Sequence, residues 1–135
     1  MANRRYDLAN QAFANGEIDW TNDTFRAYLI DLNDYTPNFA TDEFLDDIPA
    51  AAKVANATMV NTTVSTSGVC DADDTTFTTI SGDVSEAIVI AKWTGAEATS
   101  RLIAYIDTAT GLPATPDGGD ITVRWDDGAD KIFKL

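Results

Sequence analysis

The alternation of apolar and polar positions predicts a mainly β protein. After residue 20, short segments rich in Val, Ile and Thr recur between turn residues such as Gly, Pro, Asn and Asp. This pattern is typical of a β-sandwich or a small barrel. Because Ile88, Val89 and Ile90 follow one another without a polar break, 86–93 is expected to be a central strand, with Ile90 and Trp93 in the core. The expected strands span 24–32, 53–57, 59–67, 75–80, 86–93, 101–107, 121–125 and 131–135.

The first 20 residues are expected to form an arm that is separate from a single β-rich domain at 21–135. Tyr6, Ala9 and Phe13 share one face at helical spacing, and Gly16 follows as a stop, so 6–15 is predicted to be a short helix. So short a helix is marginal alone and must dock on another surface. The residues expected to form a partner interface are Arg4, Arg5, Tyr6, Phe13, Ile18 and Trp20.

A second short helix is expected at 41–48, so the fold class is mainly β with one or two helices in the N-terminal third. Thr41 can cap this helix, and Pro49 stops it. Near the end of the chain, the pair Asp127-Gly128 predicts a hairpin between 121–125 and 131–135.

The charge of the chain excludes several classes of function. With 9 basic against 22 acidic residues the net charge is −13, and a surface field of this sign repels nucleic acid phosphates. The absence of His excludes zinc sites and catalytic triads that are built on His. Arg4 and Arg5 stand at the start of this acidic chain, and a basic arm can dock on an acidic neighbour.

The single cysteine and the lack of long apolar runs favour a protein made in the cytosol. Cys70 has no second Cys to pair with, and the acidic residues Asp71, Asp73 and Asp74 that follow it disfavour a reactive thiolate. No run approaches the ~20 apolar residues of a membrane span, and no apolar segment follows the N-terminal arginines to form a secretory signal. No membrane partner is therefore expected.

The acidic clusters leave two interpretations open, solvated turns or a Ca²⁺ site. None matches the EF-hand order, and no cofactor is expected. Glu86 is a candidate for paired-carboxylate hydrolysis, but no catalytic motif accompanies it, so no enzymatic activity is expected. The aromatic residues are either core or a carbohydrate-stacking platform. The acidic clusters are Asp42/Glu43/Asp46/Asp47, Asp71/Asp73/Asp74 and Asp126/Asp127/Asp130, and the aromatic residues are Trp20, Trp93, Trp125, Tyr28, Tyr105 and Phe133.

Several stretches resemble a family of small virion structural proteins of tailed bacteriophages, and the likeness they carry covers nearly the whole chain. They are Gly16–Trp20, Asp71–Asp74 with Thr76-Phe77, Ser85–Ile90, Ser100–Asp107 with Gly111–Pro113, Gly118–Trp125 and Lys131–Leu135. The resemblance implies a capsid decoration, or cement, protein on the outer surface of the virion, assembled in the host cytoplasm. It implies the major capsid protein and sister subunits, as a homotrimer, as partners.

Three alternatives to capsid decoration remain open at this point. The first is a tail, neck or fibre-adaptor component of the same kind of particle, with tail or neck proteins as partners. The second is a receptor- or glycan-binding module exposed on the virion, and the third is a cell-wall hydrolase. The number of copies per particle distinguishes a decoration protein from a tail component. Binding to glycans would favour the receptor- or glycan-binding module, and clearing of cell-wall suspensions would favour the hydrolase.

Overall fold

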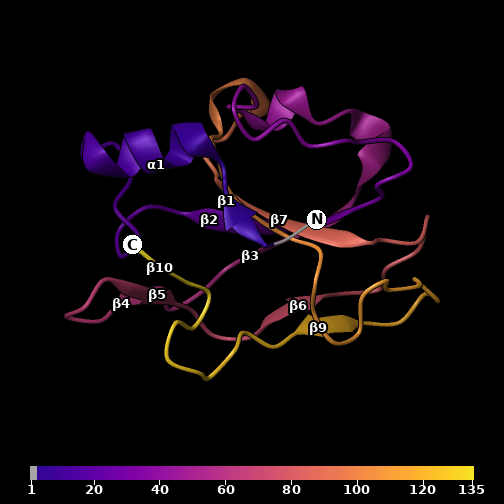
Figure 1. Cartoon of the computed structure of the whole chain (residues 1–135). Helices are drawn as coiled ribbons and strands as arrows, with labels where there is room; N and C mark the ends of the chain where they lie inside the picture. Colours follow the sequence, from indigo (N-terminus) through magenta and orange to yellow (C-terminus); the bar gives the residue numbers. More distant parts are fainter. Residues whose placement is uncertain (1–2) are drawn as a thin grey trace.

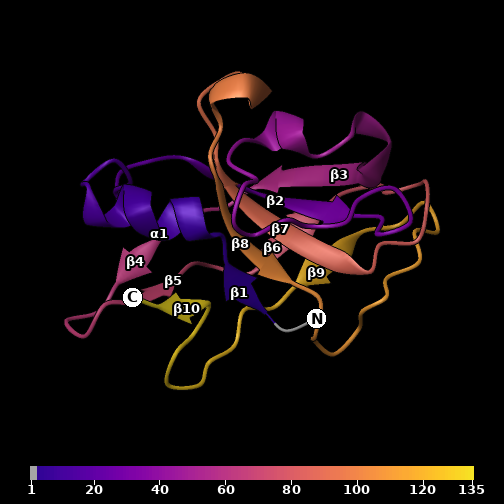
Figure 2. The same cartoon turned by 45° about the horizontal axis from the view of Figure 1, so that its top comes forward.

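The computed structural model describes residues 3–135 and contains three antiparallel sheets and one α-helix, which confirms the mainly β class. The architecture is compatible with a small β-sandwich. The largest sheet has five neighbouring strands (Figure 2). In spatial order these are β1 (Arg4–Arg5), β8 (Leu102–Ile106), β7 (Ala87–Lys92), β2 (Phe25–Ile30) and β3 (Lys53–Thr58).

Two smaller sheets cover one face of the five-stranded sheet, and the helical segments cover the other (Figure 1). The helical segments are α1 (Asp7–Ala14) and the single 3-10 turns η1 (Leu45–Asp47), η2 (Ala50–Ala52) and η3 (Glu97–Thr99). The smaller sheets contain β10 (Phe133–Lys134), β5 (Val69–Asp71) and β4 (Thr63–Val64) in one, and β6 (Thr75–Phe77) and β9 (Ile121–Val123) in the other.

The central strands are buried because both faces of the sheet are covered. Ile88, Val89 and Ile90 are at most 4% exposed, as the unbroken apolar run predicts. The expectation for Trp93 is wrong, since this side chain is only half-buried, just beyond the end of β7. The Arg26 guanidinium lies 3.8 Å from the centre of the Trp93 ring, so the ring packs under a cation at the surface.

The expected hairpin at Asp127-Gly128 does not form. β9 pairs with β6, and β10 pairs with β5, so the two segments on either side of this turn belong to different sheets. The turn itself exists locally, because Asp126 Oδ1 accepts a hydrogen bond from the Gly128 N–H. Asp-Gly dictates a local bend, whereas the partner of each strand depends on distant segments of the chain.

Residues 3–20 are not a separate arm, and their predicted separation from the following domain is corrected by the strand pairing; residues 1–2 of the predicted arm lie outside the described residues. Arg4 and Arg5 form β1, which pairs with Tyr105 and Ala104 of β8 at an edge of the five-stranded sheet. Helix α1 follows, and the left-handed Gly16 ends it as predicted. The helix predicted at 41–48 is instead the single turn η1, in which Leu45 is buried, as is Ile48 directly after it.

Candidate functional site

An open groove of about 660 Å³ lies between the five-stranded sheet and the two-stranded sheet. On one side of the molecule β3 packs against β6, so the two sheets are joined there. Elsewhere they remain apart, and Leu29, Ile88 and Ile106 line the groove from the five-stranded sheet. The other lining segments are 108–112, in the loop after β8, and 121–126, which contains β9. The volume is in the range of ligand pockets, roughly 300–1,000 Å³.

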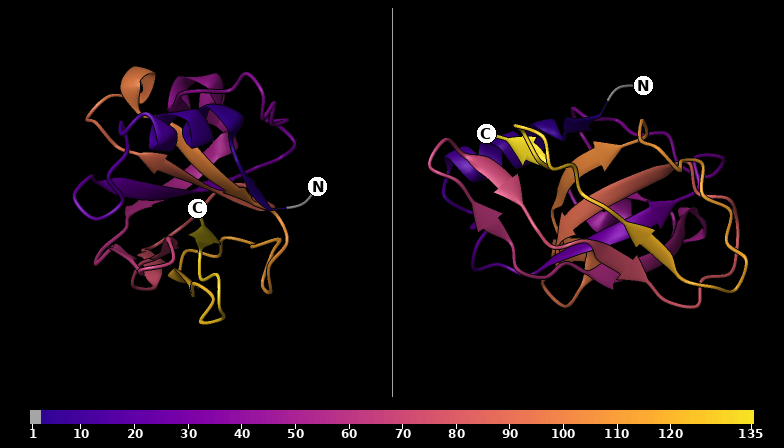
Figure 3. Two further views of the ribbon diagram at one scale, coloured as in Figure 1. Left: turned by 60° about the vertical axis from the view of Figure 1, so that its left-hand side comes forward. Right: turned by 90° about the horizontal axis from the view of Figure 1, so that it is seen from below.

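The edge of β9 that faces away from β6 borders this groove. Consecutive residues from Ile121 to Asp126 line it, which indicates that the strand presents an edge to the groove rather than one face. The two-stranded sheet provides β9 with no second neighbour among residues 3–135. The right-hand view of Figure 3 shows β6 beside β9.

The charge at the groove differs from that of the chain as a whole. Arg124 is exposed, and within residues 3–135 it has neither an ion pair nor a hydrogen bond. Lys131 also lines the groove, but its Nζ is shared between Asp71 at 3.8 Å and Asp127 at 3.6 Å. Asp126 also lines the groove but forms no ion pair with Arg124, so within residues 3–135 Arg124 is a cation without an ionic partner, in a chain whose net charge is −13. Such a cation favours a partner that brings a carboxylate.

The residues predicted as a partner interface do not form this groove. The side chains of Tyr6, Ile18 and Trp20 are at most 7% exposed and pack in the chain's own core, and their contact with a partner stays a prediction. Trp20 packs on Phe25 with ring centres 4.4 Å apart, and its Nε1–H donates a hydrogen bond to the Asp71 carbonyl. The apolar surface of Tyr6, Ile18 and Trp20 is therefore buried within the chain itself.

The other predicted interface residues are engaged within the chain. Arg4 pairs with Asp7 and lies over the Phe39 ring. Arg5 lies over the Phe133 ring and donates to the Lys134 carbonyl. Phe13 is half-buried, with its ring edge-on to Phe133. The two arginines therefore attach β1 and α1 to the body of the protein.

The acidic clusters noted in the sequence hold turns and connections in place. Asp47 Oδ2 accepts hydrogen bonds from two backbone N–H groups, and Asp42 Oδ2 accepts from the Tyr35 hydroxyl and from the backbone. Asp74 Oδ1 accepts from the Trp125 N–H and thereby connects β6 to the end of β9. Glu86, the candidate for hydrolysis, accepts a hydrogen bond from the Leu32 N–H. These are structural uses of carboxylates.

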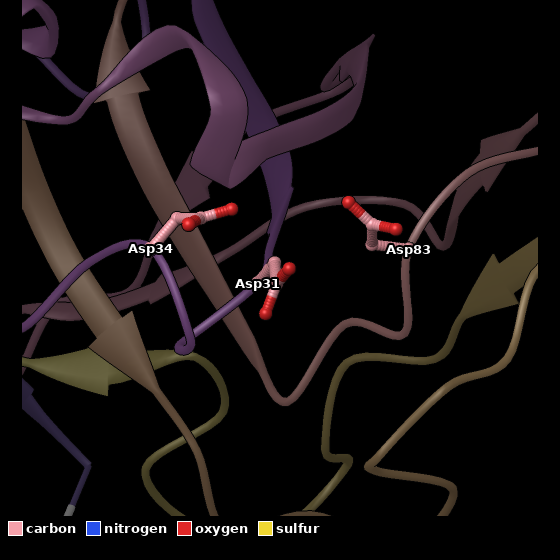
Figure 4. Close-up of side chains that lie close together, drawn as sticks. All are labelled: Asp31, Asp34 and Asp83. Carbon is pink, nitrogen blue, oxygen red and sulfur yellow. The ribbon is translucent and has the colours of Figure 1, made fainter.

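Three carboxylates that the sequence does not group meet in space. Figure 4 shows Asp31 and Asp34, from the segment after β2, together with Asp83, from the loop before β7. Each offers an oxygen within 4.8 Å of the others; Asp31 is buried and the other two are exposed. The spacing of nearly fifty residues hides this cluster from any search for local motifs. Carboxylate oxygens are ligands that hard cations accept, although Ca²⁺ takes six to eight oxygens in all.

We expect Asp83→Asn to stabilise the protein in a buffer that contains EDTA. Without a cation the three carboxylates repel one another, and two unit charges about 4 Å apart in water interact by about 1 kcal/mol. Removal of one exposed charge should therefore raise the free energy of unfolding by up to about 1 kcal/mol at low salt, measured by urea denaturation. Asp117→Asn, a change at another exposed carboxylate, is the control. A destabilised Asp83→Asn variant would contradict the expected repulsion.

The Cys70 thiol is unsuited to act as a nucleophile. Burial raises its pKa to about 11, and the positive charge of Arg5 offsets only part of this effect. The direction agrees with the sequence-based expectation, but the cause is burial rather than the neighbouring aspartates. Burial likewise raises the pKa of Tyr6, whose hydroxyl is hydrogen-bonded to Tyr35. The aromatic residues considered as a stacking platform are mostly core, since all of them except Trp93 are buried.

Comparison with known proteins adds no identification. No family model matches the sequence, and a search of curated proteins finds no match. Within residues 3–135 no helix is long and apolar enough to cross a membrane.

Proposed function

We propose that this protein is a structural component of a tailed-phage particle, and within that class a capsid decoration protein. In this role it binds the major capsid protein and sister subunits, as a homotrimer, on the outer surface of the shell, and it stabilises the contacts between capsomers. The observation that carries the proposal is the unpaired edge of β9 beside the groove. An open strand edge is a surface through which proteins associate, because it offers main-chain hydrogen bonds to an added strand.

An open strand edge supports binding to another protein, and the sequence resemblance supports a phage particle as the assembly in which that binding occurs. Gly118–Trp125, one of the stretches that carry the resemblance, contains β9, and its residues 121–125 line the groove. Ser85–Ile90 and Ser100–Asp107 include most of the central strands β7 and β8. The acidic surface also suits an external position, since packaged DNA would repel it.

The test is the abundance of the chain in purified particles. Quantitative mass spectrometry is expected to find it at a level comparable to that of the major capsid protein, with a low-copy tail protein of the same particle as the reference. A particle map should then show its density on the outer shell. Abundance equal to the tail reference would overturn decoration in favour of a tail, neck or fibre-adaptor role. Absence from particles would overturn the whole proposal.

A further inference from the structure

We propose that two copies of this chain associate through the open edge of β9, as antiparallel strands centred on Thr122. The two copies of β6-β9 then form one continuous four-stranded sheet in the order β6-β9-β9-β6. The contact is isologous, with the same residues contributed by each copy about a two-fold axis. This inference does not rest on the phage assignment, since it follows from the strand edge and its charges. A two-fold dimer through this edge replaces the homotrimer proposed above as the contact between sister subunits, because one strand edge accepts one added strand.

The residues along this edge are self-complementary in antiparallel pairing. The segment reads Asp120-Ile121-Thr122-Val123-Arg124. With Thr122 opposite the partner's Thr122, Ile121 lies opposite the partner's Val123. Arg124 lies opposite the partner's Asp120, and the symmetry repeats this pair at the other end. Opposite charges and β-branched residues in directly opposed positions both stabilise a strand pair.

The backbone of β9 is oriented for this pairing. The Trp125 N–H donates to Asp74 Oδ1, just before β6, so residue 125 has its backbone groups on the β6 side. The backbone N–H and C=O groups of successive residues point to opposite edges of a strand. Those of Ile121 and Val123 therefore point toward β6, as those of residue 125 do. Those of Thr122 and Arg124 point to the open edge. Thr122 and the partner's Thr122 would then exchange both backbone hydrogen bonds.

The two charged side chains are available for this contact. Both Asp120 and Arg124 are exposed. Asp120 Oδ1 accepts a hydrogen bond from the Thr79 N–H at 2.8 Å, which orients the carboxylate, and Oδ2 has no partner within residues 3–135. Arg124 likewise has no ionic partner there. Each copy thus supplies the charge that the other lacks, despite a net charge of −13 on each chain.

Charge reversals give a direct test, with mass measured by sedimentation and light scattering over a range of concentrations at fixed salt. The wild-type chain is expected to form dimers. Arg124→Asp and Asp120→Arg each place like charges opposite one another at both ends of the β9-β9 pair. Each is therefore expected to raise the dissociation constant of the dimer about tenfold or more. Asp120→Arg combined with Arg124→Asp in one chain restores both pairs and should restore the dimer. Lys134→Asp makes the same change in charge as Arg124→Asp, at an exposed residue of β10, and should leave the dimer intact.

A mixture of the two single variants tests the antiparallel register itself. In a heterodimer of Arg124→Asp with Asp120→Arg, both opposed positions carry opposite charges, so native mass spectrometry should find heterodimers in excess of either homodimer. Circular dichroism should show that all variants are folded. A wild-type monomer at the highest concentration would overturn the proposal, as would a dimer or trimer that is insensitive to these reversals. The proposal would also be overturned if the β9 edge bound an extended peptide from another protein but no second copy of this chain.

Discussion

Deletion of residues 1–20 is expected to unfold the remaining chain, rather than to release a folded domain that has lost only an arm. The deleted segment contributes β1 at the edge of the five-stranded sheet and the buried side chains of Tyr6, Ile18 and Trp20. Trp20 alone is expected to be worth about 3–5 kcal/mol. Because domains are stable by only about 5–15 kcal/mol, loss of the whole segment removes most of that margin.

The measurement is the cooperative unfolding transition of the truncated chain, followed by circular dichroism in urea. Trp20→Ala is the sharper variant, since it removes one side chain and leaves the hydrogen bonds of β1 in place. It should lower the free energy of unfolding by about 3–5 kcal/mol. Gln11→Ala, an exposed change on α1, should alter stability by less than about 0.5 kcal/mol. A truncated chain that unfolds cooperatively with near wild-type stability would restore the arm hypothesis.

Ile90→Ala is expected to lower the free energy of unfolding by about 2–5 kcal/mol. Ile90 is fully buried in β7, where it lies opposite Ala27 of β2 and Ala104 of β8. Small neighbours on both sides limit the collapse of the cavity that the substitution leaves, so a value in the upper half of this range is expected. Ile90→Val, which removes one methylene, should cost about 0.5–1.5 kcal/mol and shows whether the loss scales with volume.

Trp93→Ala provides a contrast at a larger but half-buried side chain. Its loss removes the contact with Arg26, and cation–π contacts contribute about 0.5–2 kcal/mol depending on exposure. We therefore expect a smaller loss than for Ile90→Ala, in the same urea titration. A loss at Trp93 that exceeds the loss at Ile90 would show that the ring is anchored more deeply than its exposure indicates.

Local patterns predicted the elements of this protein well where the pattern itself contains the physical cause. The apolar run Ile88–Ile90 requires cover on both faces, which only a central strand provides. Gly16 ends α1 because it adopts a left-handed conformation that other residues avoid. The class of fold therefore followed from spacing and turn residues.

The candidate site could be predicted from the sequence much less well than the secondary-structure elements. The Ile-Thr-Val alternation predicts a strand at 121–125, but which edge stays unpaired depends on β9 pairing with β6, about fifty residues earlier. Arg124 was one basic residue among nine in the sequence, and only the structure shows that it lacks an ionic partner within 3–135. The cluster of Asp31, Asp34 and Asp83 was hidden for the same reason.

The sequence by itself determined a mainly β class, the central strand, the short first helix and the acidic charge of the chain. These depend on local periodicity and on composition, which need no knowledge of distant contacts. Only the tertiary structure decided that residues 3–20 are part of the body, that the last two strands belong to different sheets, and that β9 keeps an open edge. Such features arise from pairing between segments far apart in the chain, where each strand has several possible neighbours and the packing of the whole selects one.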